Sequence, residues 1–136
     1  MNYADKIASF LDSEEIVVYN REGANFFTHP VIEPNDFIPE KSAFIFAPTG
    51  GSQPAISFDN TEIRYPVFQI IVRGNVDQYL EGEEFSNEIY NALEKANISD
   101  FIDVRCQQSG PVWIGYDEGN RPRWSINVEL LVEREY

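Results

Sequence analysis

The clearest pattern along the chain is an alternation of apolar and polar residues near its C-terminus. Trp124, Ile126, Val128, Leu130 and Val132 occupy every second position, and residues two apart on a strand point to the same face. This run predicts a strand with one face in the core. Shorter apolar or β-branched runs predict further strands. They are residues 16–19, 43–47, 67–73, 102–107 and 112–116.

Two segments instead repeat their apolar residues with the period of an α-helix, residues 2–12 and residues 77–96. In the longer one, Phe85, Ile89 and Leu93 recur every four residues and form a stripe that faces a core. The order of elements predicts an α+β fold. We expect one mixed or antiparallel sheet of about four to five strands, with two helices packed on one face.

The remaining segments give no periodic signal. Pro30, Pro34 and Pro39 interrupt residues 24–42, and proline disrupts helices and sheet ladders alike. We therefore expect a Pro-rich ordered loop on the domain, or an arm that reaches a neighbouring molecule. Residues 52–65 are polar and predict no element.

Length and charge limit the possible partners. The 136 residues suit a single domain spanning 1–136. The formal net charge is -13 and no basic patch is present, so tight binding to a nucleic-acid backbone is not expected. The apolar runs are too short to cross a bilayer, so no membrane partner is expected. A single cysteine, Cys106, suits a reducing compartment.

Candidate catalytic chemistry is sparse. His29 and Cys106 are the single residues of their types, so a catalytic pair would require those two to meet. One cysteine and one histidine cannot form a structural zinc site. The Gly50-Gly51 turn lacks the lysine of a phosphate-binding loop. We therefore assign no catalytic residue, metal site or cofactor and expect no enzyme. A small enzyme or a ligand-binding domain is the alternative, and it predicts a deep pocket with perturbed titratable groups.

Five segments carry a family likeness in their order along the chain. They are residues 7–11 (IASFL), 48–51 (PTGG), 65–74 (YPVFQIIVRG), 89–93 (IYNAL) and 107–128 (QQSGPVWIGYDEGNRPRWSINV). Together they resemble the tail terminator (minor capsid) family of long-tailed bacteriophages. The likeness covers nearly the whole chain and is weakest between residues 20 and 42.

The resemblance implies a structural virion protein of the tail or neck, assembled in the bacterial cytoplasm. Such proteins form a ring, typically of six copies, at the head-proximal end of the tail tube. The ring stops tube polymerisation and provides the head-tail joining surface. The implied partners are copies of the chain, the tail tube protein and a head-completion or neck protein, with DNA passing through without specific binding. The alternative is another neck or tail component, a head-completion or tube protein, on a related fold.

Contacts in a ring join two different patches of each subunit. The candidate residues for the subunit or partner interface are Thr49, Gly50, Gly51, Tyr116, Asp117, Arg121 and Arg123. One hypothesis is that the two arginines meet the acidic face of a neighbouring helix, and the alternative is that they are solvated. Helix 77–96 carries the candidate acidic face, Glu81, Glu84 and Glu88. This face either lines a channel that DNA slides through or is an ordinary solvated surface.

Overall fold

The computed structural model describes residues 2–30, 38–56, 61–94 and 96–135. Within them the chain forms two helices and eight strands. These are α1 (Tyr3–Ser13), β1 (Phe26–Phe27), β2 (Ser42–Phe46), β3 (Ser52–Ile56), β4 (Thr61–Tyr65), β5 (Val67–Arg73), α2 (Tyr79–Leu93), β6 (Asp103–Cys106), β7 (Val112–Tyr116) and β8 (Pro122–Glu135). The α+β class predicted from the periodicities is confirmed.

The strands form one mixed sheet in which β1 and β2 are parallel and the other pairs are antiparallel. The expected count of four to five strands is too low, because β1 lies in the Pro-rich segment 24–42 and β3 and β4 lie in the polar segment 52–65. Main-chain pairing in a sheet does not require an apolar sequence, so alternation alone cannot find such strands. The strand predicted at 16–19 is also wrong. Among the described residues, that segment contributes an isolated bridge between Tyr19 and Phe26.

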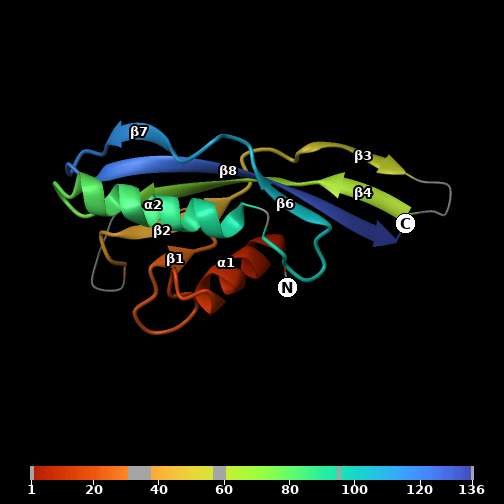
Figure 1. The fold of residues 1–136 in the computed structure, drawn as a ribbon, viewed down its shortest axis with the longest axis horizontal. Coiled ribbons are helices and arrows are strands. Elements are labelled where there is room, and N and C mark those ends of the chain that lie inside the picture. The colour runs from red at the N-terminus through yellow and green to blue at the C-terminus, as the bar shows by residue number, and fades with distance from the viewer. Residues whose placement is uncertain (1, 31–37, 57–60, 95, 136) are drawn as a thin grey trace.

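Strand β8 is the axis of the sheet and runs along most of the molecule (Figure 1). It pairs with β4 and β5 on one side and with β6 and β7 on the other. The ladder continues in one register across Pro66, from Val67 opposite Glu129 to Arg64 opposite Val132. The Pro66 carbonyl still accepts a hydrogen bond from the Leu130 amide at 2.8 Å. Proline lacks an amide donor, so it divides the long strand into β4 and β5 without shifting the register.

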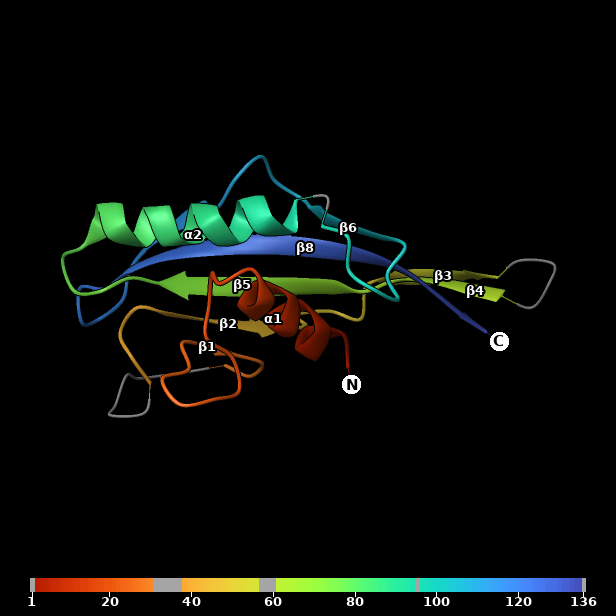
Figure 2. The same cartoon turned by 60° about the horizontal axis from the view of Figure 1, so that its bottom comes forward.

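The core is one cluster of buried side chains from both helices and the sheet. Figure 2 shows α2 running along β8, with which it is in contact. The apolar set predicted on β8 is buried throughout, with Val128 and Leu130 fully inaccessible. Ile7 of α1 and Ile89 of α2 belong to the same hydrophobic cluster, and the two helices contact each other. Burial of these side chains is the main stabilising contribution, at about 25 cal/mol per Å² of apolar surface.

The observed helix boundaries differ slightly from those predicted from the apolar periodicity. Helix α1 begins after Asn2, whose side chain accepts a hydrogen bond from the Asp5 amide at 2.8 Å and so caps the first turn. Helix α2 is shorter than the predicted 77–96, because Asp77 has a left-handed backbone with φ of 57°. The Asp77 amide donates to the Asn120 carbonyl at 3.2 Å. The start of α2 is therefore attached to the turn that precedes β8.

Candidate interaction surfaces

The hairpin between β7 and β8 is held by one carboxylate. Asp117 Oδ1 accepts hydrogen bonds from the amides of Gly119 and Arg121 at 2.9 and 3.0 Å. Its Oδ2 accepts from Arg121 Nε at 2.8 Å. Burial alone would raise the pKa of Asp117, but the hydrogen bonds from Arg121 and Gly119 hold it below its ordinary value. The turn is therefore a fixed structure.

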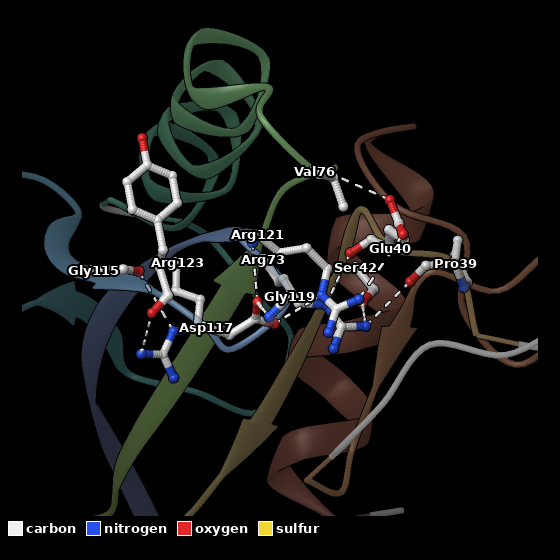
Figure 3. A network of polar contacts seen from close by, with 11 residues as sticks. Pro39, Glu40, Ser42, Arg73, Val76, Gly115, Asp117, Gly119, Arg121 and Arg123 are labelled. Carbon is white, nitrogen blue, oxygen red and sulfur yellow. Dashed lines mark hydrogen bonds and ion pairs between the residues drawn. The ribbon is translucent and has the colours of Figure 1, made fainter.

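A polar network links this hairpin to the end of the Pro-rich segment (Figure 3). Arg121 Nη1 lies 3.9 Å from Glu40 Oε1, and Glu40 Oε2 accepts from the Val76 amide at 3.4 Å. The buried Arg73 donates from Nε to the Glu40 carbonyl at 3.0 Å and from Nη2 to Ser42 Oγ at 3.2 Å. Burial, and secondly the nearby Arg121 charge, lower the pKa of Arg73. Of segment 24–42, residues 31–37 lie outside the described residues.

An aromatic cluster surrounds Trp113 of β7. The Trp113 ring centroid lies 5.0 Å from Tyr79, 5.1 Å from Tyr116 and 5.3 Å from Trp124. These distances suit favourable edge-to-face packing. Trp124 is 2% exposed, whereas Trp113 is 41% and Tyr116 is 51% exposed. The cluster therefore has a buried base and an exposed rim.

Strand β7 presents this rim at the edge of the sheet. Its other large side chains, Val112 and Ile114, are also exposed, and among the described strands β7 pairs with β8 alone. The register shifts between Trp113 and Gly115, which has φ of 91°. Such a bulge redirects the strand. An apolar edge strand of this kind is a typical site for association with another chain.

Arg123 lies at the rim of the aromatic cluster. Its Nη2 donates to the Tyr116 carbonyl at 3.3 Å, and its Nε lies 3.5 Å from the Gly115 carbonyl (Figure 3). Within the described residues it forms no ion pair with a carboxylate. Arg121 differs, because it is bound to Asp117 and Glu40. The structure thus separates two arginines that the sequence presented as equivalent.

The other predicted interface residues lie beside a hollow. Thr49 and Gly50 line an open depression of about 250 Å³, together with Arg64, Pro66 and Phe68 among others. Gly51 closes the turn with φ of 83°, and a Cβ at this position would lie 2.2 Å from the Tyr65 carbonyl oxygen. Glycine is therefore required there.

The two groups of candidate residues belong to opposite edges of the sheet. Strand β7 lies beyond β8, whereas β2, which leads into the Thr49–Gly51 turn, lies on the far side of β5. The structure brings Tyr116, Asp117 and Arg123 together at one edge and Thr49 to Gly51 together at the other. Sequence reasoning missed Trp113, although its position in an apolar run next to a predicted turn was visible.

The three predicted acidic residues lie on exposed positions of α2. Glu81 Oε1 lies 3.4 Å from Lys41 Nζ and accepts a hydrogen bond from Asn75 Nδ2 at 3.2 Å. Within the described part of the chain, Glu84 and Glu88 form no ion pair. The local charge of α2 is therefore only partly neutralised.

The residues considered for catalysis have separate surroundings. His29 packs against the ring of Phe27 at 5.8 Å. Cys106 lies against α2, with its Sγ 4.0 Å from the Tyr90 carbonyl oxygen. Burial, and secondly the charge of Glu94, raise the pKa of Cys106 to about 12. In the ranges that the structure describes, no group of three His, Cys, Asp or Glu residues is arranged to hold a metal ion. The same residues contain no helix long and apolar enough to span a membrane.

Comparison with known proteins identifies the family. The sequence model described as bacteriophage tail terminator protein matches residues 10–134. A comparison with curated proteins gave no match. The family match covers both edge surfaces, helix α2 and almost all of the sheet. It confirms the resemblance to tail terminators predicted from the sequence, although most of the first segment, residues 7–11, precedes the matched range. The chain therefore belongs to the bacteriophage tail terminator family.

Proposed function

We propose that this chain forms a ring, of six copies, at the head-proximal end of the phage tail tube. There it stops tube polymerisation and provides the surface that joins tail to head. The family match over residues 10–134 carries this proposal. The partners are copies of the chain, the tail tube protein and a head-completion or neck protein, and no bond is made or broken. The working unit is one domain, residues 1–136, with segment 24–42 as a loop or arm.

The arrangement of the candidate surfaces supports a ring. Rings that close need heterologous contacts, in which one patch of each subunit meets a different patch of the next. The hairpin surface around Tyr116, Asp117 and Arg123 and the turn Thr49–Gly51 lie at opposite edges of the sheet. Two separate patches on opposite sides are what a head-to-tail contact requires.

A second subunit contact within this proposal joins Arg123 to the acidic face of helix α2 on a neighbouring copy. Arg123 has no carboxylate partner among the described residues, and Glu84 and Glu88 are exposed on α2. We expect Arg123 to meet acids of a neighbouring subunit. Arg121 also belongs to this hypothesis, but reversing its charge would disrupt the Asp117 turn. Arg123→Glu is therefore the cleaner variant, and unchanged rings in sedimentation would refute the contact.

The acidic face of α2 has an alternative role to this subunit contact, as the wall of the channel. Duplex DNA carries one negative charge per about 1.7 Å of axis, so a wall bearing Glu81, Glu84 and Glu88 would repel it and allow sliding. An electron cryomicroscopy map of the ring tests this. If these side chains lie on the outer rim, the channel role is wrong.

The role itself is tested in particles that lack the protein. Electron microscopy of phage without this gene should show tails of abnormal length that fail to join heads. Adding the purified chain should restore normal joined particles. Deficient phage with tails of correct length attached to capsids would refute the role.

A tube or head-completion role is the second candidate, because related folds serve several virion positions. Assembly behaviour separates the candidates. A terminator caps tubes and closes into single rings, whereas a tube protein forms open-ended stacks. Stacks of the purified chain that grow with concentration would favour the tube role.

A further inference from the structure

The exposed rim of the aromatic cluster is a preorganised anchor. Trp113 is 41% exposed, yet its ring is held by three aromatic neighbours. The base of the cluster is fixed because Gly82 of α2 approaches Trp124 so closely that a Cβ there would lie 2.6 Å from the indole. A side chain that is already ordered loses little conformational entropy on binding. Exposed tryptophans of this kind dominate the binding energy of many interfaces.

The hollow at the opposite edge has the size and chemistry to receive such a ring. It is an open depression of about 250 Å³, so the edge of an aromatic ring can enter it from the solvent side. The apolar part of its lining includes Pro66 and Phe68, and the exposed residues Thr49 and Gly50 also line it.

Charge favours the same pairing. Glu118, at the tip of the hairpin, is exposed and forms no ion pair among the described residues. Arg64 lines the hollow with a side chain that is 39% exposed. Its Nε pairs with Glu62, and a guanidinium carries four further N–H groups. In a chain of net charge -13, a local acid-base pair offsets part of the repulsion between copies.

We propose that the exposed edge of Trp113 of one copy packs into the hollow beside Thr49 and Gly50 of a second copy, with Glu118 facing Arg64. This rests on the proposed ring function and names the contact that builds the ring. Because β7 and the Thr49–Gly51 turn lie at opposite edges, each copy carries one anchor and one hollow. Successive copies therefore associate head to tail.

The test is cysteine cross-linking in phage particles complemented with variants of this chain. Ile114→Cys places a thiol beside the anchor and Thr49→Cys places one at the rim of the hollow. A short bis-maleimide is applied and products are separated by denaturing electrophoresis. Cys106 is the native background: its thiol has a pKa of about 12, and a protonated thiol reacts slowly. The chain without added cysteines measures that background.

The double variant should give a ladder of multimers, each single variant alone should give none, and the two single variants mixed should give dimers alone. Adding Trp113→Ala to the double variant should reduce the ladder about tenfold or more, while circular dichroism confirms folding. A control with Asn91→Cys on α2 in place of Ile114→Cys should give no ladder.

Several results would overturn this contact. They are a single variant that cross-links to itself, a product with the mass of another virion protein, and particles that contain the chain but give no ladder. Absence of the wild-type chain from the particles refutes the proposed ring function as well, so the two failures are distinguishable.

Discussion

At Gly82, helix propensity and tertiary packing predict opposite effects of an alanine substitution on stability. Replacing glycine by alanine inside a helix ordinarily stabilises it by about 0.5–1 kcal/mol. Here the new Cβ would lie 2.6 Å from Cζ3 and 2.9 Å from Cη2 of Trp124. Ordinary contacts begin near 3.4 Å, so the helix or the indole would have to move by about 0.8 Å.

That movement is opposed from two sides. The Trp124 ring lies 5.2 Å from Tyr79 and 5.3 Å from Trp113, and the added Cβ would also lie 3.3 Å from the Gly74 Cα. Overpacking in a well-packed site costs about 1–3 kcal/mol. The clash therefore outweighs the propensity gain, and Gly82→Ala should lower the free energy of unfolding by about 1–2 kcal/mol.

Urea unfolding followed by circular dichroism measures this change. Asn87→Ala, at an exposed position of the same helix, is the matched control and should raise stability by a few tenths of a kcal/mol. Trp124→Phe should relieve part of the clash, so the double variant should be less destabilised than the sum of the single changes. If Gly82→Ala raises stability as much as Asn87→Ala does, the packing argument is wrong.

Three further predictions concern other contacts of the chain. Asp117→Ala removes the acceptor of three hydrogen bonds and should lower the free energy of unfolding by about 1–3 kcal/mol at pH 7. The pKa of Asp117 is lower in the folded state than in the unfolded state. Its contribution to the free energy of unfolding is therefore present above the unfolded-state pKa of about 3.9 and is lost as the pH falls through the folded-state pKa. The stability gap between wild type and this variant should therefore shrink between pH 5 and pH 3, as urea titrations would show, and a constant gap contradicts the assignment. Arg73→Met leaves the Glu40 carbonyl and Ser42 without their hydrogen-bond donor and should lower the free energy of unfolding by about 2–3 kcal/mol. Proteolytic cleavage near residues 38–42 should become faster. Unchanged protection from cleavage would show that Arg73 does not anchor this segment. Cys106 should react slowly with a thiol reagent at pH 8 in the folded protein and rapidly in denaturant, and equal rates would show that the thiol is accessible.

The sequence identified the elements whose burial imposes a period. Strand β5 has the bounds that its apolar run predicted, and the alternating face of β8 is buried as expected. Strand β7 also has the predicted bounds, although its large side chains are exposed. A strand with one buried face has an apolar residue at every second position, and this alternation is visible in the sequence. The resemblance to tail terminators could also be found from the sequence alone, because it consists of segments that follow one another in order along the chain.

The tertiary structure alone determined the features that depend on distant neighbours. Strands β3 and β4 exist because β8 extends far enough to pair with β4, which their polar sequence does not reveal. The different surroundings of Arg121 and Arg123, and the placement of Trp113 and the Thr49–Gly51 turn at opposite edges, follow from the order of strands in the sheet. Sequence periodicity indicates which side chains are buried. It does not indicate which element packs against or pairs with them, because that depends on contacts between distant parts of the chain that form when the whole chain folds.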